Sequence, residues 1–226
     1  MPLHLQREIE NLKKEILTLG ALVEQTVRNA TLALETRDEV LARNVIEKDT
    51  RTDQKEVEVE ESCLKILALY QPVAIDLRFI IAVLKINNDL ERVGDLAVNI
   101  AERAAFLATQ PRVSVSLDFA GMANKAQLML KESLDALVNM SADLARQVCA
   151  SDDEIDTMNR QMYLTVQDGI RQHPEQLESL IHLLSASRHL ERIADHATNI
   201  AEDVIYMIEG EIVRHKAEEY KSHPRH

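Results

Sequence analysis

The sequence predicts an all-α protein whose six helices form two tandem, duplicated three-helix bundles. Three observations favour this fold. The 226 residues include only five glycines and five prolines, and long stretches free of both are rich in Leu, Ala, Glu, Ile and Lys, as in helical proteins. Apolar residues recur three and four positions apart, which is the period of an amphipathic helix. A segment of the first half also returns one hundred residues later in the second half.

The first three helices are placed by the apolar period and by the residues that interrupt it. The first is expected over residues 3–34, and its apolar stripe consists of Ile9, Leu12, Ile16, Leu19, Val23 and Val27. The second follows a turn at residues 36–38 and continues to Tyr70. Pro72 ends it, because proline breaks a helix interior and disfavours helix in the residue before it. The third is expected over residues 73–108.

A linker separates the first three helices from the last three. The stretch TQPRVSVSLD, residues 109–118, contains a proline and alternates Val with Ser, so it breaks the helical period. Asp118 is suited to cap the helix that follows. The remaining segments are the fourth helix at 119–150, the fifth at 151–172, the sixth at 175–214 and a fraying tail at 215–226.

The two halves of the chain are predicted to be copies of one three-helix unit. Between residues 89–103 and 189–203, nine of fifteen positions are identical. The first unit therefore spans residues 1–108 and the second 119–214. Short turns between long helices make sequential helices antiparallel neighbours.

Charge and hydropathy limit the classes of partner. The net charge of −12 makes nucleic acid a poor partner, because binding to phosphate backbones depends on clustered Lys and Arg. No apolar run approaches the roughly 20 residues that cross a bilayer, and the first residues lack the apolar core of a signal peptide. We expect a cytoplasmic protein that meets a membrane only through partners. Cys63 and Cys149 have no metal-ligand spacing and are expected to be small core residues.

An acidic line follows the third helix and recurs on the sixth. At about 100° per residue the members of each line fall within an arc of about 80°. They are Glu91, Asp95, Asn99 and Glu102 in the first unit, and Glu191, Asp195, Asn199 and Glu202 in the second. Ile80 and Leu84 continue the first line, so the acids lie in line with apolar side chains. Carboxylates in such a position are unfavourable unless they are paired or bind a metal.

The residues themselves leave three interpretations of the acidic lines open. The acids can form a solvated face, with Arg92 and Arg192 as partners, or they can bind a cation. Acid–base catalysis is the third, although no nucleophile or oxyanion donor can be identified. A cation would need ligands from a second helix, and the candidates are Asp49 and Asp53 in the first unit and Asp152 and Asp156 in the second. Carboxylate and amide oxygens suit Mg²⁺, Mn²⁺, Ca²⁺ or oxygen-ligated iron.

The histidines of the sixth helix are poor candidates for the same metal. His182, His189 and His196 recur every seven residues, about 10.5 Å apart along a helix axis. They also fall on the side of the helix away from the acidic line, so we expect them on a solvated face. There is no Glu-x-x-His pair of the kind that di-iron bundles use. Arg78, near the start of the third helix, either belongs to a capping and dipole arrangement at that helix N-terminus or lines a docking or anion site.

The repeated motifs resemble those of the PhoU family of bacterial phosphate-uptake regulators. The resemblance rests on LERVGDLAVNIAERA, LERIADHATNIAED and QPVAIDLRFII, and it covers residues 4–216. It implies a cytoplasmic, mostly dimeric protein with two three-helix bundles. It also implies clusters of iron or other divalent ions on the acidic motifs, leaving Fe, Mn, Mg, Zn and Ca as candidates. One departure is that the second unit has no residue matching Arg78.

The resemblance also implies a function. PhoU-like proteins act as negative regulators between the ATPase of the phosphate ABC transporter and a two-component sensor kinase of the phosphate-starvation response. We expect such a metal-binding adaptor and no enzyme. The alternatives are a structural helical interaction module without metal and, less favoured, a metal-dependent phosphatase.

Overall fold

The protein is all-helical in the computed structural model, which describes residues 3–210. In chain order the elements are α1 (Leu3–Thr36), α2 (Glu39–Glu47), α3 (Asp49–Tyr70), α4 (Ala74–Ala108), α5 (Phe119–Asn139), α6 (Ala142–Ala150), α7 (Asp152–Gln172), a short 3-10 helix η1 (Pro174–Gln176) and α8 (Leu177–Glu209). The shorter α2 and α6 precede α3 and α7, so each unit consists of two long helices and one interrupted helix. The all-α fold with two duplicated three-helix units is therefore confirmed.

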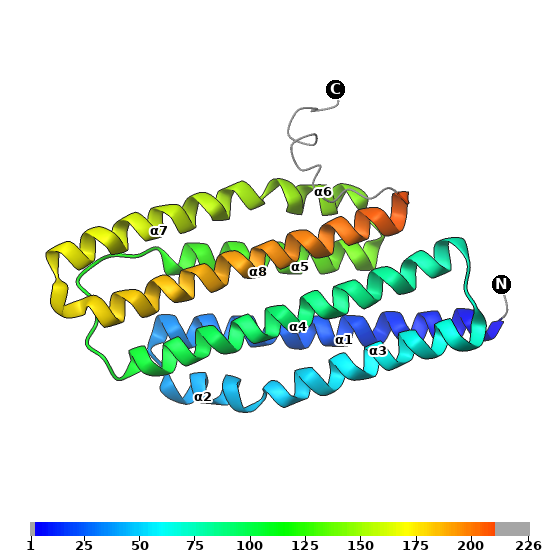
Figure 1. Ribbon diagram of the computed structural model, residues 1–226, viewed down its shortest axis with the longest axis horizontal. Helices are drawn as coiled ribbons and strands as arrows, with labels where there is room; N and C mark the ends of the chain where they lie inside the picture. Colours follow the sequence, from blue (N-terminus) through cyan, green and yellow to red (C-terminus); the bar gives the residue numbers. More distant parts are fainter. Residues whose placement is uncertain (1–2, 211–226) are drawn as a thin grey trace, which may run out of the picture.

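The long helices run roughly along the longest axis of the molecule (Figure 1). Helices α3 and α7 lie at opposite edges, with α4 and α8 side by side between them. Helix α1 packs against α3 and α4, and α5 packs against α7 and α8. The α3–α4 and α7–α8 contacts therefore lie on either side of the central pair. None of the helices within residues 3–210 is long and apolar enough to cross a membrane.

In the second unit the helix predicted over residues 119–150 is divided into α5 and α6, so the interrupted helix begins at Ala142 and not at residue 151. Met140 has a left-handed backbone (φ 49°), and the side chain of Ser141 accepts a hydrogen bond from Leu144 N, so α5 ends and α6 begins there. Arg37 (φ 59°) and Asp38 make the same turn between α1 and α2. The prediction of a single helix over residues 119–150 is therefore wrong. The turn was missed because no glycine or proline marks it. The expected second helix is likewise interrupted, at the turn between α2 and α3.

The other helix ends follow the expected signals. Helix α3 ends at Tyr70, two residues before Pro72, and α7 ends at Gln172, where η1 follows. Helix α8 ends at Glu209, before the predicted end at residue 214, because Gly210 caps it with φ +76°. Glycine adopts this left-handed conformation without a steric cost. The predicted tail at 215–226 lies outside the described residues.

One aliphatic core extends through both units. The apolar stripe predicted for the first helix is buried throughout, as are the inner faces of α4 and α8. Cys63 is fully buried and Cys149 partly buried against this core, as expected for small core residues. Burial raises the pKa of both thiols to about 12, so they stay protonated at neutral pH.

Helices α4 and α8 pack antiparallel and are joined by polar contacts. Lys85 Nζ lies 3.0 Å from Asp203 Oδ1 near one end of the pair, and Arg103 Nε donates to Ser185 Oγ at 3.4 Å near the other. The side chain of Asp203 is only 2% exposed, so this carboxylate depends on its partners. The contact between the units is therefore aliphatic with a fixed set of polar pairs.

The three histidines of α8 line this contact, so the expectation of a solvated face is wrong. His182 stacks on Phe106 of α4 with ring centroids 4.0 Å apart. His196 Nδ1 lies 2.8 Å from Asp89 Oδ1, also on α4. His189 is partly buried, and its Nδ1 has no hydrogen-bond partner. The seven-residue spacing marks the face of α8 that packs on the other unit.

Candidate metal sites

In the first unit, carboxylates of α3 and α4 face one another. The pKa of Asp49 is raised by burial and by the charges of Asp53, on the same helix, and Asp95, on α4. The pKa of Glu91 is also raised, first by burial, then by Asp95, with Asp53 of α3 contributing. Like charges act across the two helices, so the four acids form one electrostatic group, which we call the first cluster.

The second unit repeats this arrangement between α7 and α8. Burial is the largest cause of the raised pKa of Asp152, followed by the charges of Asp195 and Asp156. Glu191 has a pKa raised by burial and by the same two aspartates. The pKa of Asp195 is raised by burial and then by Asp156. Asp152, Asp156, Glu191 and Asp195 thus form the second cluster.

The remaining members of the acidic lines make other contacts. Asn99 donates to the backbone carbonyl of Asp95 at 2.9 Å, and Glu102 lies 3.3 Å from Arg103. Asn199 turns toward α4, where its Nδ2 donates to Asp89 Oδ1 at 3.3 Å. The charge of Glu202 raises the pKa of Cys149 on α6, after burial. None of these contacts is with a carboxylate side chain of either cluster.

Arginine pairing offsets only part of the first cluster's charge. Arg92 lies 3.3 Å from Glu91 and 3.6 Å from Asp95. Its side chain is 55% exposed, so solvent screens these contacts and each stabilises little. Within residues 3–210, no three His, Cys, Asp or Glu side chains lie close enough together to hold a metal ion. An ion would therefore need the carboxylates to turn toward a common point.

Two residues that the sequence analysis did not single out fit a cation beside the first cluster. Asn87 is 2% exposed, and its Nδ2 donates to the carbonyl oxygen of Glu56 at 3.1 Å and to Glu56 Oε1 at 3.0 Å. Both partners are acceptors, so the amide nitrogen must face them. Asn87 Oδ1 is left buried without a partner. A buried acceptor oxygen next to carboxylates is what a hard cation would satisfy.

The sequence did contain a signal for these two residues. Asn87 lies four positions before Glu91 and so shares its helix face. Glu56 lies three positions after Asp53 on α3, and its charge raises the pKa of Glu91. The pKa of Glu56 itself is raised, first by burial, then by Glu60 and Asp53. Extending the acidic pattern by one turn would have found both.

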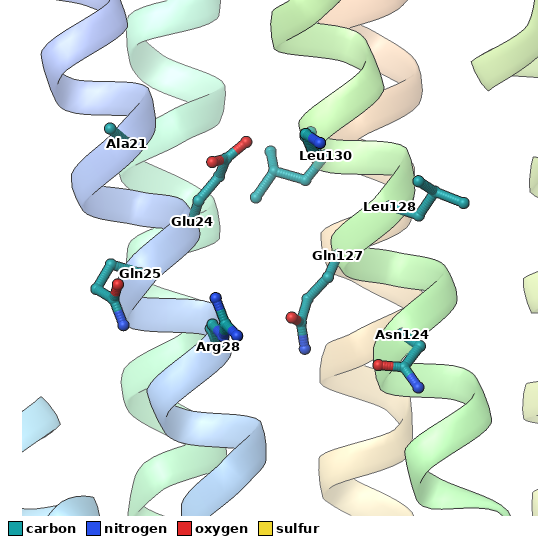
Figure 2. Close-up of a pocket in the computed structure, with 9 residues that line it drawn as sticks. Ala21, Glu24, Gln25, Arg28, Asn124, Gln127, Leu128 and Leu130 are labelled. Carbon is teal, nitrogen blue, oxygen red and sulfur yellow. The ribbon is translucent and has the colours of Figure 1, made fainter.

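A groove elsewhere in the molecule has different chemistry. It lies between α1 and α5, has a volume of about 330 Å³ and is lined by Glu24, Arg28, Asn124, Gln127 and Lys131 among others (Figure 2). Burial raises the pKa of Glu24, the charge of Asp135 raises it further, and Lys131 lowers it. Charges of both signs line this groove, and no residue of either acidic cluster does.

Arg78 lies at the end of α8. An added Cβ at Gly210 would come within 2.6 Å of Arg78 Nη1, so the guanidinium packs against the C-terminal end of that helix. Helix C-termini favour cations, because their last carbonyls carry partial negative charge. The contact is with the C-terminus of another helix, and the predicted arrangement at the N-terminus of Arg78's own helix stays untested; Arg78 Nε is buried without a hydrogen-bond partner.

The fold and the two clusters define a class of duplicated three-helix proteins with one acidic group per unit. The PhoU domain matches residues 16–104 and 119–204. The chain belongs to the PhoU family.

Relatives cover nearly the whole chain. It is 38% identical to a "Phosphate-specific transport system accessory protein PhoU homolog" of Aquifex aeolicus, over 93% of this chain and 95% of that protein. The corresponding homolog of Pseudomonas aeruginosa is 39% identical over 92% of this chain and 86% of its own length.

Solved structures agree with the fold. The crystal structure of PhoU from Pseudomonas aeruginosa has a TM-score of 0.89 at 36% identity, over 91% of this chain and 99% of that one. The phosphate transport system regulatory protein PhoU of Streptococcus pneumoniae has a TM-score of 0.83 at 30% identity, over 92% and 99%.

Proposed function

We propose that this protein is a negative regulator of phosphate uptake and of the phosphate-starvation response. It acts as a metal-binding cytoplasmic adaptor between the ATPase of the phosphate ABC transporter and a two-component sensor kinase. The names of its relatives, which are accessory or regulatory proteins of phosphate transport, support the role in transport. The kinase contact follows from the resemblance of the acidic motifs to the family. The protein is not an enzyme in this proposal.

The observation that carries the metal-binding part is the pair of acidic clusters at equivalent positions. In each unit two aspartates of the outer helix lie close enough to two acids of the central helix for their charges to act across the contact, which helps to raise the pKa of Asp49 and Glu91 in the first unit and of Asp152, Glu191 and Asp195 in the second. A bound divalent or iron ion would supply the positive charge that offsets this repulsion. The carboxylates would hold α3 against α4, and α7 against α8. Because α4 packs on α8, loading either cluster would stabilise the face shared by the units.

Elemental analysis of the full chain, purified without added metal or an affinity tag, tests this part. We expect more than about one bound ion per chain, lost in an Asp95→Ala/Asp195→Ala double variant that stays folded. The matched control is Asp143→Ala/Asp168→Ala, which removes two exposed aspartates outside the clusters. No metal in the wild-type protein would contradict metal binding and favour the structural interaction module.

The partner assignments need their own measurements. Co-purification with the transporter ATPase and with the sensor kinase, with and without chelator, tests the adaptor role. The resemblance also implies a homodimer, and light scattering on the purified chain tests it. Turnover of phosphate esters that follows metal loading would instead favour the phosphatase, which two ions about 4 Å apart could support.

A further inference from the structure

We infer that the two clusters are unequal, and that the first, extended by Glu56 and Asn87, is the high-affinity divalent-cation site of the chain. The inference rests on the proposed function, since it concerns the same ion. It assigns two further residues to the site and an order of loading.

Glu56 and Asn87 have equivalents in the second unit that keep the contact and change its chemistry. Asp49 and Asp152 are equivalent, as are Glu91 and Glu191, so Glu56 corresponds to Asn159 and Asn87 to Ser187. Ser187 Oγ donates to Asn159 Oδ1 at 3.1 Å, where Asn87 donates to Glu56 Oε1 at 3.0 Å. The same bridge between two helices therefore ends on a carboxylate in one unit and on a neutral amide in the other.

The bridge leaves a free acceptor only in the first unit. Asn87 Oδ1 is buried without a partner, whereas Ser187 presents a single hydroxyl, which lies within hydrogen-bond distance of both Asn159 Oδ1 and the carbonyl of Leu184. Within residues 3–210, no buried side-chain atom of the second bridge lacks a partner. A cation beside the first cluster would satisfy an oxygen that nothing else satisfies.

A second substitution changes the charge in the same direction. Asn88 of the first unit corresponds to Arg188 of the second, and the charge of Arg188 lowers the pKa of Glu191 and Asp195. The first cluster with Glu56 has five carboxylates facing one guanidinium, that of Arg92. The second has four carboxylates, or five with Asp153, whose charge raises the pKa of Asp152, and it has two guanidiniums, those of Arg188 and Arg192, which lower the pKa of Asp195. Cation affinity rises with the negative charge of the ligand set, so the first site should bind more tightly.

Titration of the chelator-treated full chain with Mn²⁺ tests the inference, with the electron paramagnetic resonance signal of free Mn²⁺ as the readout. We expect two classes of binding site at neutral pH, the first at least about tenfold tighter than the second. Glu56→Gln should remove that difference by weakening the tight class. Glu58→Gln is the matched control, because Glu58 is exposed on the same helix and pairs with Lys55.

A gain of affinity provides the converse test, which a folding defect cannot imitate. Asn159→Glu combined with Arg188→Asn should bring the second class to within about threefold of the first. Two equal classes in the wild-type protein, or a tight class unchanged by Glu56→Gln, would overturn the inference and leave the proposed metal binding intact. No Mn²⁺ bound at all would overturn both.

Discussion

His196 and Asp89 join the two units by a short polar contact, with imidazole Nδ1 2.8 Å from carboxylate Oδ1. Asn199 donates to the same oxygen at 3.3 Å. The side chains of His196 and Asp89 are 17% and 9% exposed, so neither is well solvated. A buried carboxylate needs such partners, and here all of those named come from the other unit. The contact therefore ties the relative position of the units to a specific pair of residues.

Asp89→Ala is expected to lower the free energy of unfolding by about 1–3 kcal/mol, because it leaves the facing polar groups of His196 and Asn199 without their acceptor. Denaturant unfolding followed by circular dichroism measures the change. Asn88→Ala, an exposed neighbour on the same helix, is the control and should change stability by less than about 0.5 kcal/mol. Equal effects of the two variants would mean that the contact does not hold the units together.

His189 should make the protein less stable in mild acid. Burial, and then the charges of Arg103, Arg192 and Arg188, lower its pKa from the ordinary 6.5 to about 4. Between these values the unfolded chain takes up a proton that the folded chain does not. Stability contributed by the neutral imidazole is therefore present above pH 6.5 and is lost as the pH falls toward 4.

Comparison of wild-type protein with His189→Gln isolates this effect, because other titrating groups are common to both. Between pH 7 and pH 5 the wild-type protein should lose roughly 1 kcal/mol more stability than the variant, a value reduced for partial exposure. Thermal unfolding across that range measures it. Parallel pH profiles for the two proteins would contradict the prediction.

Glu91→Gln should raise the stability of the metal-free protein and reduce the stability that the protein gains from metal. The raised pKa of Glu91 means that its charged form is disfavoured in the fold, so at pH 7 the chelator-treated variant should be more stable by about 0.5 kcal/mol. With Mn²⁺ present, the variant should gain less stability than the wild-type protein, since a ligand is lost. Melting temperatures in chelator and in Mn²⁺ give both values. If the metal-free variant is the less stable protein, repulsion is not the dominant effect at this position.

Acid should release the metal. Protons compete with the ion for carboxylates, and the raised pKa values of Asp49, Glu91, Asp152, Glu191 and Asp195 shift this competition toward higher pH than for an ordinary carboxyl group. We expect bound Mn²⁺ after equilibrium dialysis to fall steadily from pH 7 to pH 5. Metal content that is the same at both values would point to ligands other than these carboxylates.

Much of the fold follows from local sequence. The apolar period of α1 places that helix, and the prolines after α3 and α7 place the ends of those two helices, within a few residues, because each signal acts on its own segment. The turn at Met140 escaped prediction, since a left-handed methionine has no marker comparable to a glycine. The turn at Arg37 and Asp38 was predicted in the first unit, and its equivalence to the turn at Met140 becomes visible when the two units are compared as structures.

The acidic clusters, too, were predicted in part from the sequence and in part only visible in the structure. The register of Glu91 and Asp95 with Asp49 and Asp53 follows from helical spacing and duplication, and the pKa shifts agree with four acids facing one another. The free oxygen of Asn87 could not be foreseen, because it depends on the amide nitrogen being held by Glu56 on another helix.

The sequence by itself determined the helical class, most of the helix ends, the duplication and the face of each helix that carries acids, since all of these depend on spacing along one chain. Only the tertiary structure decided what each remaining face touches. The histidines of α8 lie opposite its acids, as spacing requires, yet they contact Phe106 and Asp89 instead of solvent. A helical period gives a direction around an axis, and the neighbour in that direction is set by how the two units pack.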